Sequence, residues 1–289
     1  MLTTAEIKKK VRELEIRSKK LTAHLFTGEY HSAFKGRGMS FKEVREYQHG
    51  DDTRFIDWNV SARFGHPYSK LFEEERELTM MLLVDVSASS LFGTIHQRKK
   101  DLVTEVCAVL AFAAANNNDK VGAILFSDRI ESYIPAKKGK EHVLSIVRQL
   151  LTLEPKSKGT DLNAAVRYFN NAVKQKSIVF ILSDFLVEKY DDPLRVAGNK
   201  HDVIGIKVYD KMDMELPKAG LLQVEDAETG RQQWIDTGNA LVQYNYAQQF
   251  NQTEEACRNS FKKAGADLIY LRTDDDHVKL LQQFFIKRK

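Results

Sequence analysis

From residue 78 onward, short apolar runs of strand length alternate with longer segments whose apolar residues recur every three or four positions. The first run, 78–84, is almost continuously apolar, as expected of a strand covered on both faces. Further strands are predicted at 121–126, 130–134 (an edge strand), 177–182, 203–209 and 268–272, and helices at 96–116, 141–153, 162–174, 193–199, 243–264 and 278–286. This alternation is typical of right-handed βαβ crossovers, so we predict a doubly wound α/β domain whose mainly parallel sheet is flanked by helices.

Three segments depart from this alternation. Residues 4–25 have helical periodicity after a capping box at Thr3 to Glu6, and we expect this helix to pack on its own domain, with a partner helix as the alternative. Residues 26–63 are interrupted by glycines, which predicts short strands and turns. Residues 210–238 contain two short β segments, which predicts a hairpin insertion. We therefore expect an N-terminal extension, 1–77, packed on a core domain, 78–289.

Composition narrows the class of protein. With 43% hydrophobic residues, 29% charged residues and only 5 prolines among 289 residues, the chain is neither largely disordered nor collagen-like. Its two cysteines, Cys107 and Cys257, exclude a disulfide scaffold and suit a reducing compartment. The sequence shows neither a secretory signal nor an apolar stretch of membrane-spanning length. We expect a cytoplasmic, globular protein.

The net charge of +4 comes from one end of the chain. Residues 1–63 contain 13 Lys and Arg against 9 Asp and Glu, and the remaining residues are balanced. No basic stripe with interleaved aromatic residues accompanies the excess. We therefore expect no nucleic-acid partner.

Oxygen-bearing side chains follow the predicted strands. The first strand leads into Asp85, Ser87 and Ser89, the strand at 177–182 leads into Asp184, and Thr160 precedes the helix at 162. Because ligands of open α/β sheets bind beyond the carboxyl ends of strands, we expect these side chains to converge. Such oxygens suit Mg²⁺, Mn²⁺ or Ca²⁺, with water in the remaining positions and one position open to an external carboxylate. Alternatively, the serines cap a turn and the aspartates form salt bridges.

The Asp-x-Ser-x-Ser string at 85–89, taken with Thr160 and Asp184, resembles the metal-ion-dependent adhesion site of von Willebrand factor A domains. The resemblance implies that Ser87, Ser89 and Thr160 ligate the metal directly. It implies that Asp85 and Asp184 act directly or through water.

A second pattern spans residues 28–63. Its glycines, Gly28, Gly36, Gly38 and Gly50, and its string Asp57-Trp58-x-x-Ser61-Ala62-Arg63 resemble the bacterial MoxR-associated von Willebrand factor A-like proteins, catalogued as domain of unknown function 58. This resemblance implies a MoxR-type AAA+ ATPase as partner, in chaperone-like complex assembly. Ser90 and Lys158 depart from the family pattern, but neither change removes a ligand oxygen.

The charged residues of this segment allow two interpretations. They could form a partly buried ion-pair network around Trp58 that locks the extension to the core. They could instead form a docking surface for a partner, with Arg45, Arg54, Asp57 and Trp58 as its contact residues. The sequence favours the structural interpretation, since glycine-punctuated segments with paired charges usually pack locally.

Enzymatic motifs are missing from the sequence. Haloacid-dehalogenase phosphatases need a second acid two residues after the nucleophile, and that place holds Ser87. No P-loop, nucleophile elbow or zinc motif is present, and the eight histidines lack ligand spacing. We predict a non-enzymatic, divalent-cation-dependent protein-interaction module. The alternatives are a scaffold that uses helix 4–25 and a structural metal, and a Mg²⁺-dependent phosphohydrolase.

Overall fold

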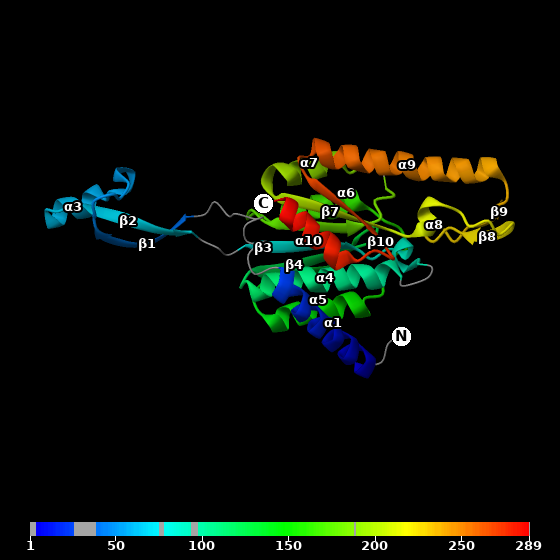
Figure 1. The fold of residues 1–289 in the computed structure, drawn as a ribbon, viewed down its shortest axis with the longest axis horizontal. Helices are drawn as coiled ribbons and strands as arrows, with labels where there is room; N and C mark the ends of the chain where they lie inside the picture. Colours follow the sequence, from blue (N-terminus) through cyan, green and yellow to red (C-terminus); the bar gives the residue numbers. More distant parts are fainter. Residues whose placement is uncertain (1–3, 26–38, 75–77, 94–97, 188, 289) are drawn as a thin grey trace. The chain divides into compact units, whose positions relative to one another are not determined.

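The computed structural model describes residues 4–25, 39–74, 78–93, 98–187 and 189–288 (Figure 1). The chain divides into two compact units, one made of Met1–Ala33 with Thr79–Lys289 and the other of Phe34–Leu78. The boundary near residue 78 is where the strand and helix alternation begins. The predicted extension is divided differently from our expectation, because its first helix belongs to the larger unit.

A six-stranded sheet forms the centre of the larger unit, in the order β10-β7-β6-β3-β4-β5. Its strands are β3 (Thr79–Asp85), β4 (Lys120–Phe126), β5 (Ile130–Lys137), β6 (Ile178–Ser183), β7 (Asp202–Tyr209) and β10 (Asp267–Arg272). Every neighbouring pair is parallel except β4 with β5, which is antiparallel. The predicted fold class is therefore confirmed, including the edge position of β5. The strand order reverses at β3, which lies between β4 and β6.

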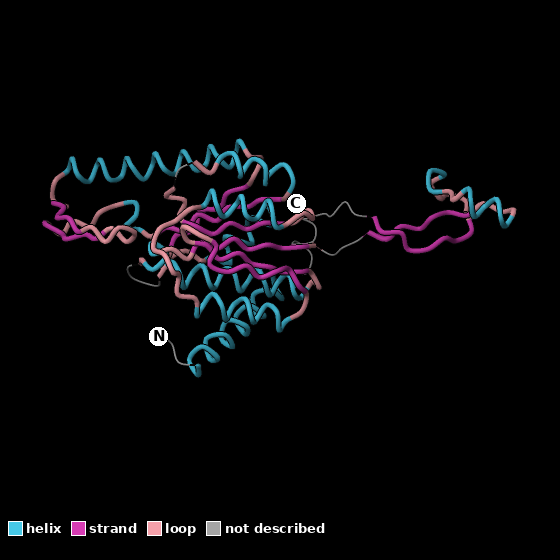
Figure 2. The backbone as a smooth tube through the Cα atoms, turned by 180° about the vertical axis from the view of Figure 1, so that it is seen from behind, coloured by secondary structure: helices cyan, strands magenta, loops and turns pink. Residues whose placement is uncertain are grey.

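Helices cover both faces of this sheet (Figures 1 and 2). One face carries α4 (Lys99–Asn116) and α5 (Lys140–Thr152), with α1 (Thr4–Leu25) packed on both of them. The other face carries α6 (Leu162–Ala172), α7 (Asp191–Lys200) and α9 (Ala240–Lys263). The last helix, α10 (His277–Lys287), is tied to α4 through His277, whose Nε2 lies 3.7 Å from Glu105 Oε2.

Burial explains the sequence pattern. Every residue of β3 is buried, as are 13 residues of α4, because both elements are covered on all sides.

Helix α7 and the end of α9 can approach closely only because residue 198 is glycine. A Cβ atom there would lie 2.1 Å from the carbonyl oxygen of Ala264. Both cysteines are free and buried, and no described helix has the length and apolarity needed to cross a bilayer.

Helix α1 packs on its own unit, as expected. Val11 and Leu14 are buried, and Lys10 Nζ lies 2.8 Å from Asp101 Oδ1 of α4. Lys140 Nζ lies 2.5 Å from Glu15 Oε1. The described part of its apolar face is therefore covered within the chain.

The smaller unit consists of β1 (Met39–Glu46) and β2 (Tyr68–Glu74), which pair antiparallel, with α3 (Trp58–Phe64) between them in sequence. Helix α3 was missed in the sequence, because seven residues are too few for a helical period to show. Its limits come from its caps: the Asp57 side chain accepts from the amides of Asn59 and Val60, and Gly65 ends the helix with φ +74°. The predictions on Gly28, Gly36 and Gly38 lie outside the described residues.

The charged residues that the structure describes in this unit form local pairs rather than the predicted partly buried network around Trp58. Arg45 Nη2 lies 2.8 Å from Asp51 Oδ1, and Arg54 Nη2 lies 2.6 Å from Asp52 Oδ2. The side chain of Asp57 caps α3 and lies 3.3 Å from Lys70 Nζ. Trp58 itself is 72% exposed. Each pair joins residues that are close in sequence. It therefore stabilises a turn or the end of a helix and does not draw the charges together around one residue.

The predicted insertion is confirmed as a hairpin of β8 (Leu221–Glu225) and β9 (Gln232–Asp236). It is preceded by the short helix α8 (Lys211–Met214), which we did not predict. A capping box of Asp210 and Asp213 starts this helix. Four residues give no periodicity, so only the spacing of these two aspartates signals α8.

Candidate metal centre

The first part of the site is the turn that follows β3. Asp85 is 5% exposed, and its Oδ1 accepts a hydrogen bond of 2.9 Å from the amide of Ser87. Ser87 precedes a 3-10 helix, Ala88–Leu91, but its side chain makes no capping hydrogen bond. Instead, Ser87 Oγ lies 3.1 Å from Ser89 Oγ. The alternative in which Ser87 caps the turn is therefore wrong, and its hydroxyl faces the other serine.

The second part is the end of β6. The Ser183 hydroxyl donates a hydrogen bond of 2.7 Å to Asp85 Oδ2 and accepts one of 3.1 Å from the amide of Phe185. Asp184 is 7% exposed, and its Oδ1 accepts from the amide of Leu186 at 3.3 Å. Its other oxygen, Oδ2, is buried and has no hydrogen-bond partner among the described residues. A buried carboxylate oxygen without such a partner is costly unless a cation compensates it.

Burial and charge act together on Asp85. Burial and, after it, the nearby Asp184 carboxylate together raise the pKa of this carboxyl to about 6. Hydrogen bonds from Ser87 and Ser183 oppose the rise. At neutral pH the ionised Asp85 is therefore held at a cost, which a bound dication would relieve.

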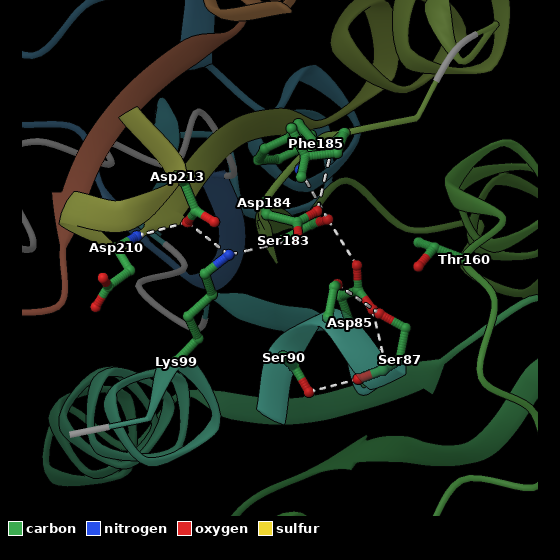
Figure 3. Close-up of polar contacts among 12 residues, drawn as sticks. Asp85, Ser87, Ser90, Lys99, Thr160, Ser183, Asp184, Phe185, Asp210 and Asp213 are labelled. Atoms are coloured by element: carbon green, nitrogen blue, oxygen red, sulfur yellow. Dashed lines mark hydrogen bonds and ion pairs between the residues drawn. The ribbon is translucent and has the colours of Figure 1, made fainter. Parts of the chain in front are cut away.

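Two lysines flank Asp184. Lys99, the first residue of α4, places Nζ 2.7 Å from Asp213 Oδ2 and 3.8 Å from Asp184 Oδ2, with its side chain 4% exposed (Figure 3). Lys207 of β7 is fully buried and donates to the carbonyl oxygen of Asp184. The salt-bridge alternative is therefore correct in part for Asp184. Its partner Lys99 remains outside direct hydrogen-bond distance.

The third part is Thr160, in the loop before α6. This loop is tied to the turn after β3, because the Ala88 amide donates a hydrogen bond of 3.1 Å to the carbonyl oxygen of Lys158. Figure 3 shows Thr160 on the opposite side of Asp85 from Lys99. The Thr160 hydroxyl donates a hydrogen bond of 2.9 Å to Glu228 Oε1, in the turn of the β8–β9 hairpin.

A small cavity lies between the turn after β3, the end of β6 and the start of α4. Its volume is about 10 Å³, about enough for one water molecule or a single ion. It is lined mainly by oxygen-bearing side chains and by one ammonium, together with Val103, Leu182 and Val208; the polar residues are Asp85, Ser89, Ser90, Lys99, Ser183 and Asp184. In the described part of the chain, no group of three or more His, Cys, Asp and Glu could hold a metal. The residues fit a hard cation held by two carboxylates and several hydroxyls, rather than zinc.

Comparison with known proteins identifies the family. The profile described as "Protein of unknown function DUF58" matches residues 43–256. This chain belongs to that family. One similar protein is uncharacterized protein Rv1480 of Mycobacterium tuberculosis. It is 30% identical over 282 residues, which cover 96% of this chain and 89% of that protein. A shorter relative, uncharacterized protein MAV169 of Mycobacterium avium, is 28% identical over 161 residues, covering 54% of this chain and 94% of that protein.

Solved structures share the fold at low sequence identity. The conserved hypothetical protein BatB from Bacteroides thetaiotaomicron covers 73% of this chain and 98% of its own, with a TM-score of 0.50 and 15% identity. The SpRpn10 VWA domain covers 72% of this chain and 95% of its own, with a TM-score of 0.44 and 11% identity. The likeness to BatB agrees with the α/β fold seen here, a mainly parallel sheet flanked by helices.

Four of the five predicted ligand residues are grouped at the ends of β3 and β6: Asp85, Ser87, Ser89 and Asp184. The fifth, Thr160, faces them from the neighbouring loop (Figure 3). Ser183 could have been recognised from its place at a strand end. No local pattern links Lys99 or Glu228 to this site, since each reaches it from a distant segment.

Proposed function

We propose that this chain is a divalent-cation-dependent protein-interaction module. Its metal would be Mg²⁺, or Mn²⁺ or Ca²⁺, held by Asp85, Ser87, Ser89, Thr160 and Asp184. The observation that carries the proposal is the buried Asp184 Oδ2, which has no hydrogen-bond partner in the described chain and lines an oxygen-rich cavity of about 10 Å³ with Asp85. When bound, the cation supplies a positive charge that attracts a carboxylate.

Charge balance makes a partner carboxylate the expected ligand. A dication beside two aspartates leaves little net charge, and the Lys99 ammonium lies 3.8 Å from Asp184. An Asp or Glu side chain of a partner is therefore attracted to the occupied site. Without the cation, the same side chain meets two buried carboxylates and is repelled.

The partner that we propose is a MoxR-type AAA+ ATPase, in chaperone-like complex assembly. The support is membership of the DUF58 family together with the sequence pattern of residues 28–63. A second contact region on the smaller unit would use Arg45, Arg54, Asp57 and Trp58. Arg54 and Trp58 have the exposure that docking needs, with Arg54 84% exposed in its side chain and Trp58 72% exposed.

The test is a pull-down of a purified MoxR-type ATPase from the same organism, with the full chain as bait. We expect capture with Mg²⁺ and its loss with EDTA or in Asp85→Ala. The control is Asp192→Ala, which removes a carboxylate that is 82% exposed in an ion pair on α7. Capture that persists in EDTA would overturn metal dependence. Metal binding without any capture would overturn the ATPase as partner.

The scaffold alternative has less support. It requires the apolar face of α1 to be available to a partner, yet Val11 and Leu14 are buried within this chain. Deleting residues 1–26 would decide between the two. Lost capture with retained metal affinity would favour the scaffold. A phosphohydrolase would need a general base near the metal, and we assign no residue to that role.

A further inference from the structure

We propose that Glu228, in the turn of the β8–β9 hairpin, is an internal ligand of the metal centre. It would occupy the position that a partner's carboxylate takes, so the hairpin must withdraw before a partner binds. This inference rests on the proposed function. It starts from one contact between residues 68 positions apart: the Thr160 hydroxyl donates a hydrogen bond of 2.9 Å to Glu228 Oε1.

The direction of this hydrogen bond leaves Thr160 free to bind a cation. A threonine hydroxyl has one proton and two lone pairs. Because Thr160 gives its proton to Glu228, its lone pairs remain available. A carboxylate acceptor at this place therefore orients the hydroxyl as a ligand rather than competing with it.

The separation of the two oxygens suits a shared ion. Mg²⁺ binds six oxygens at about 2.0–2.1 Å in an octahedron, which places neighbouring ligand oxygens about 2.9 Å apart. Thr160 Oγ1 and Glu228 Oε1 are 2.9 Å apart. One cation can therefore contact both oxygens without a large movement of the hairpin.

The hairpin turn is built to present Glu228. Asp226 Oδ1 accepts hydrogen bonds from the amides of Glu228 and Thr229, at 3.1 and 2.7 Å, and from the Thr229 hydroxyl at 2.8 Å. Gly230 adopts φ +70°, and its amide donates to the carbonyl oxygen of Asp226 at 2.8 Å. These contacts are internal to the turn, so its shape does not depend on the metal centre.

The hairpin strands are largely exposed, which suits an element that withdraws. Leu221 of β8 is 62% exposed and Trp234 of β9 is 63% exposed. Exposed apolar side chains contribute little to holding a hairpin in place. The Thr160–Glu228 contact would then hold the closed state, and a partner carboxylate would compete with Glu228 for the same position.

The experiment uses the full chain loaded with Mn²⁺ and measures water-proton relaxation, which reports water molecules bound directly to the ion. The variant is Glu228→Gln. The control is Glu225→Gln, which removes the same charge from the same hairpin at a residue that accepts from Gln232 instead. Acetate serves as the external carboxylate, and circular dichroism checks that each variant is folded.

We expect Glu228→Gln to weaken Mn²⁺ binding by about tenfold and to raise the relaxation per bound ion, because water replaces the lost ligand. Acetate should lower that relaxation in Glu228→Gln but much less in the wild type and in Glu225→Gln. If Glu228→Gln binds Mn²⁺ with wild-type affinity and relaxation, the inference is wrong and the metal centre stands. If the wild type binds no Mn²⁺, the proposed function fails and this inference fails with it.

Discussion

The ammonium of Lys99 lies 3.8 Å from Oδ2 of Asp184, and both residues line the small cavity beside Asp85 and Ser89. Its stronger partner is Asp213, at 2.7 Å. The chain therefore holds a buried cation of its own beside the place where a divalent cation would bind. Like charges so close repel, and this repulsion would set the affinity of the centre.

Replacing this cation should strengthen metal binding. We expect Lys99→Met to raise Mg²⁺ affinity by about tenfold or more, because the lost repulsion exceeds about 1.4 kcal/mol even when well screened. The metal-free variant should be less stable by about 1–3 kcal/mol, since Asp213 and Asp184 lose their partner. Isothermal titration calorimetry and urea denaturation measure the two effects.

The control for Lys99 is Lys10→Met, which removes an equal charge from a half-exposed pair with Asp101. It should change neither quantity by much. Unchanged Mg²⁺ affinity in Lys99→Met would mean that the ion does not bind near Asp184.

The cost of holding Asp85 ionised gives a second prediction. Burial and the Asp184 carboxylate raise the pKa of Asp85 to about 6, so the metal-free protein is destabilised at pH 7.5 by an ionised carboxylate. Asp85→Asn should remove this cost and raise metal-free stability, by on the order of 1–3 kcal/mol. It should also abolish the increase in melting temperature that excess Mg²⁺ gives the wild type.

Thermal unfolding with EDTA or Mg²⁺ tests this. Asp192→Asn on the surface is the control and should behave as the wild type in both conditions. A Mg²⁺-dependent rise in melting temperature that survives in Asp85→Asn would count against Asp85 as a ligand.

His201 predicts how acid affects stability. It is 4% exposed, lies against the Phe169 ring with centroids 4.7 Å apart, and has no hydrogen-bond partner on either ring nitrogen among the described residues. Burial, followed by the charge of Lys200, lowers the pKa of His201 from 6.5 to about 4. The unfolded chain therefore takes up the proton first. The contribution of neutral His201 to the free energy of unfolding is complete above pH 6.5. It is lost as the pH falls toward 4, at up to about 1.4 kcal/mol per pH unit.

We expect His201→Phe to flatten this dependence, measured by urea denaturation in EDTA between pH 7.5 and pH 5. Carboxylates also titrate in this range, so the informative quantity is the difference between variant and wild type. His66→Phe, at an exposed histidine, is the control. Parallel curves for His201→Phe and the wild type would contradict the prediction.

The smaller unit gives a prediction about docking. Trp58 is 72% exposed on α3, and an exposed tryptophan is a frequent anchor of protein interfaces. We expect Trp58→Ala to weaken capture of the ATPase by about tenfold or more while leaving Mg²⁺ affinity unchanged. Leu241→Ala, at a residue that is 65% exposed on α9, is the control. Equal capture by Trp58→Ala and the wild type would favour a purely structural role for residues 28–63.

Sequence patterns predicted the longer elements of the larger unit but missed two short helices, one in each unit. The strands from β3 to β10 follow short apolar runs, and their helices follow apolar periodicities of more than one turn. Both patterns can be recognised locally. Helices α3 and α8 are seven and four residues long, and their caps define them instead. The division of residues 1–78 between two units depends on which surfaces α1 covers, which no local pattern encodes.

The sequence by itself determined the α/β fold class and the oxygen-bearing residues at the ends of β3 and β6, because strand ends are fixed by local hydropathy and parallel strands end at one edge. Only the tertiary structure decided that Ser183 bonds to Asp85, that Lys99 lies beside Asp184 and that Glu228 reaches Thr160. These contacts join residues separated by 68 to 98 positions. They depend on the register of the sheet and on the path of an inserted hairpin, which are set by packing across the whole unit.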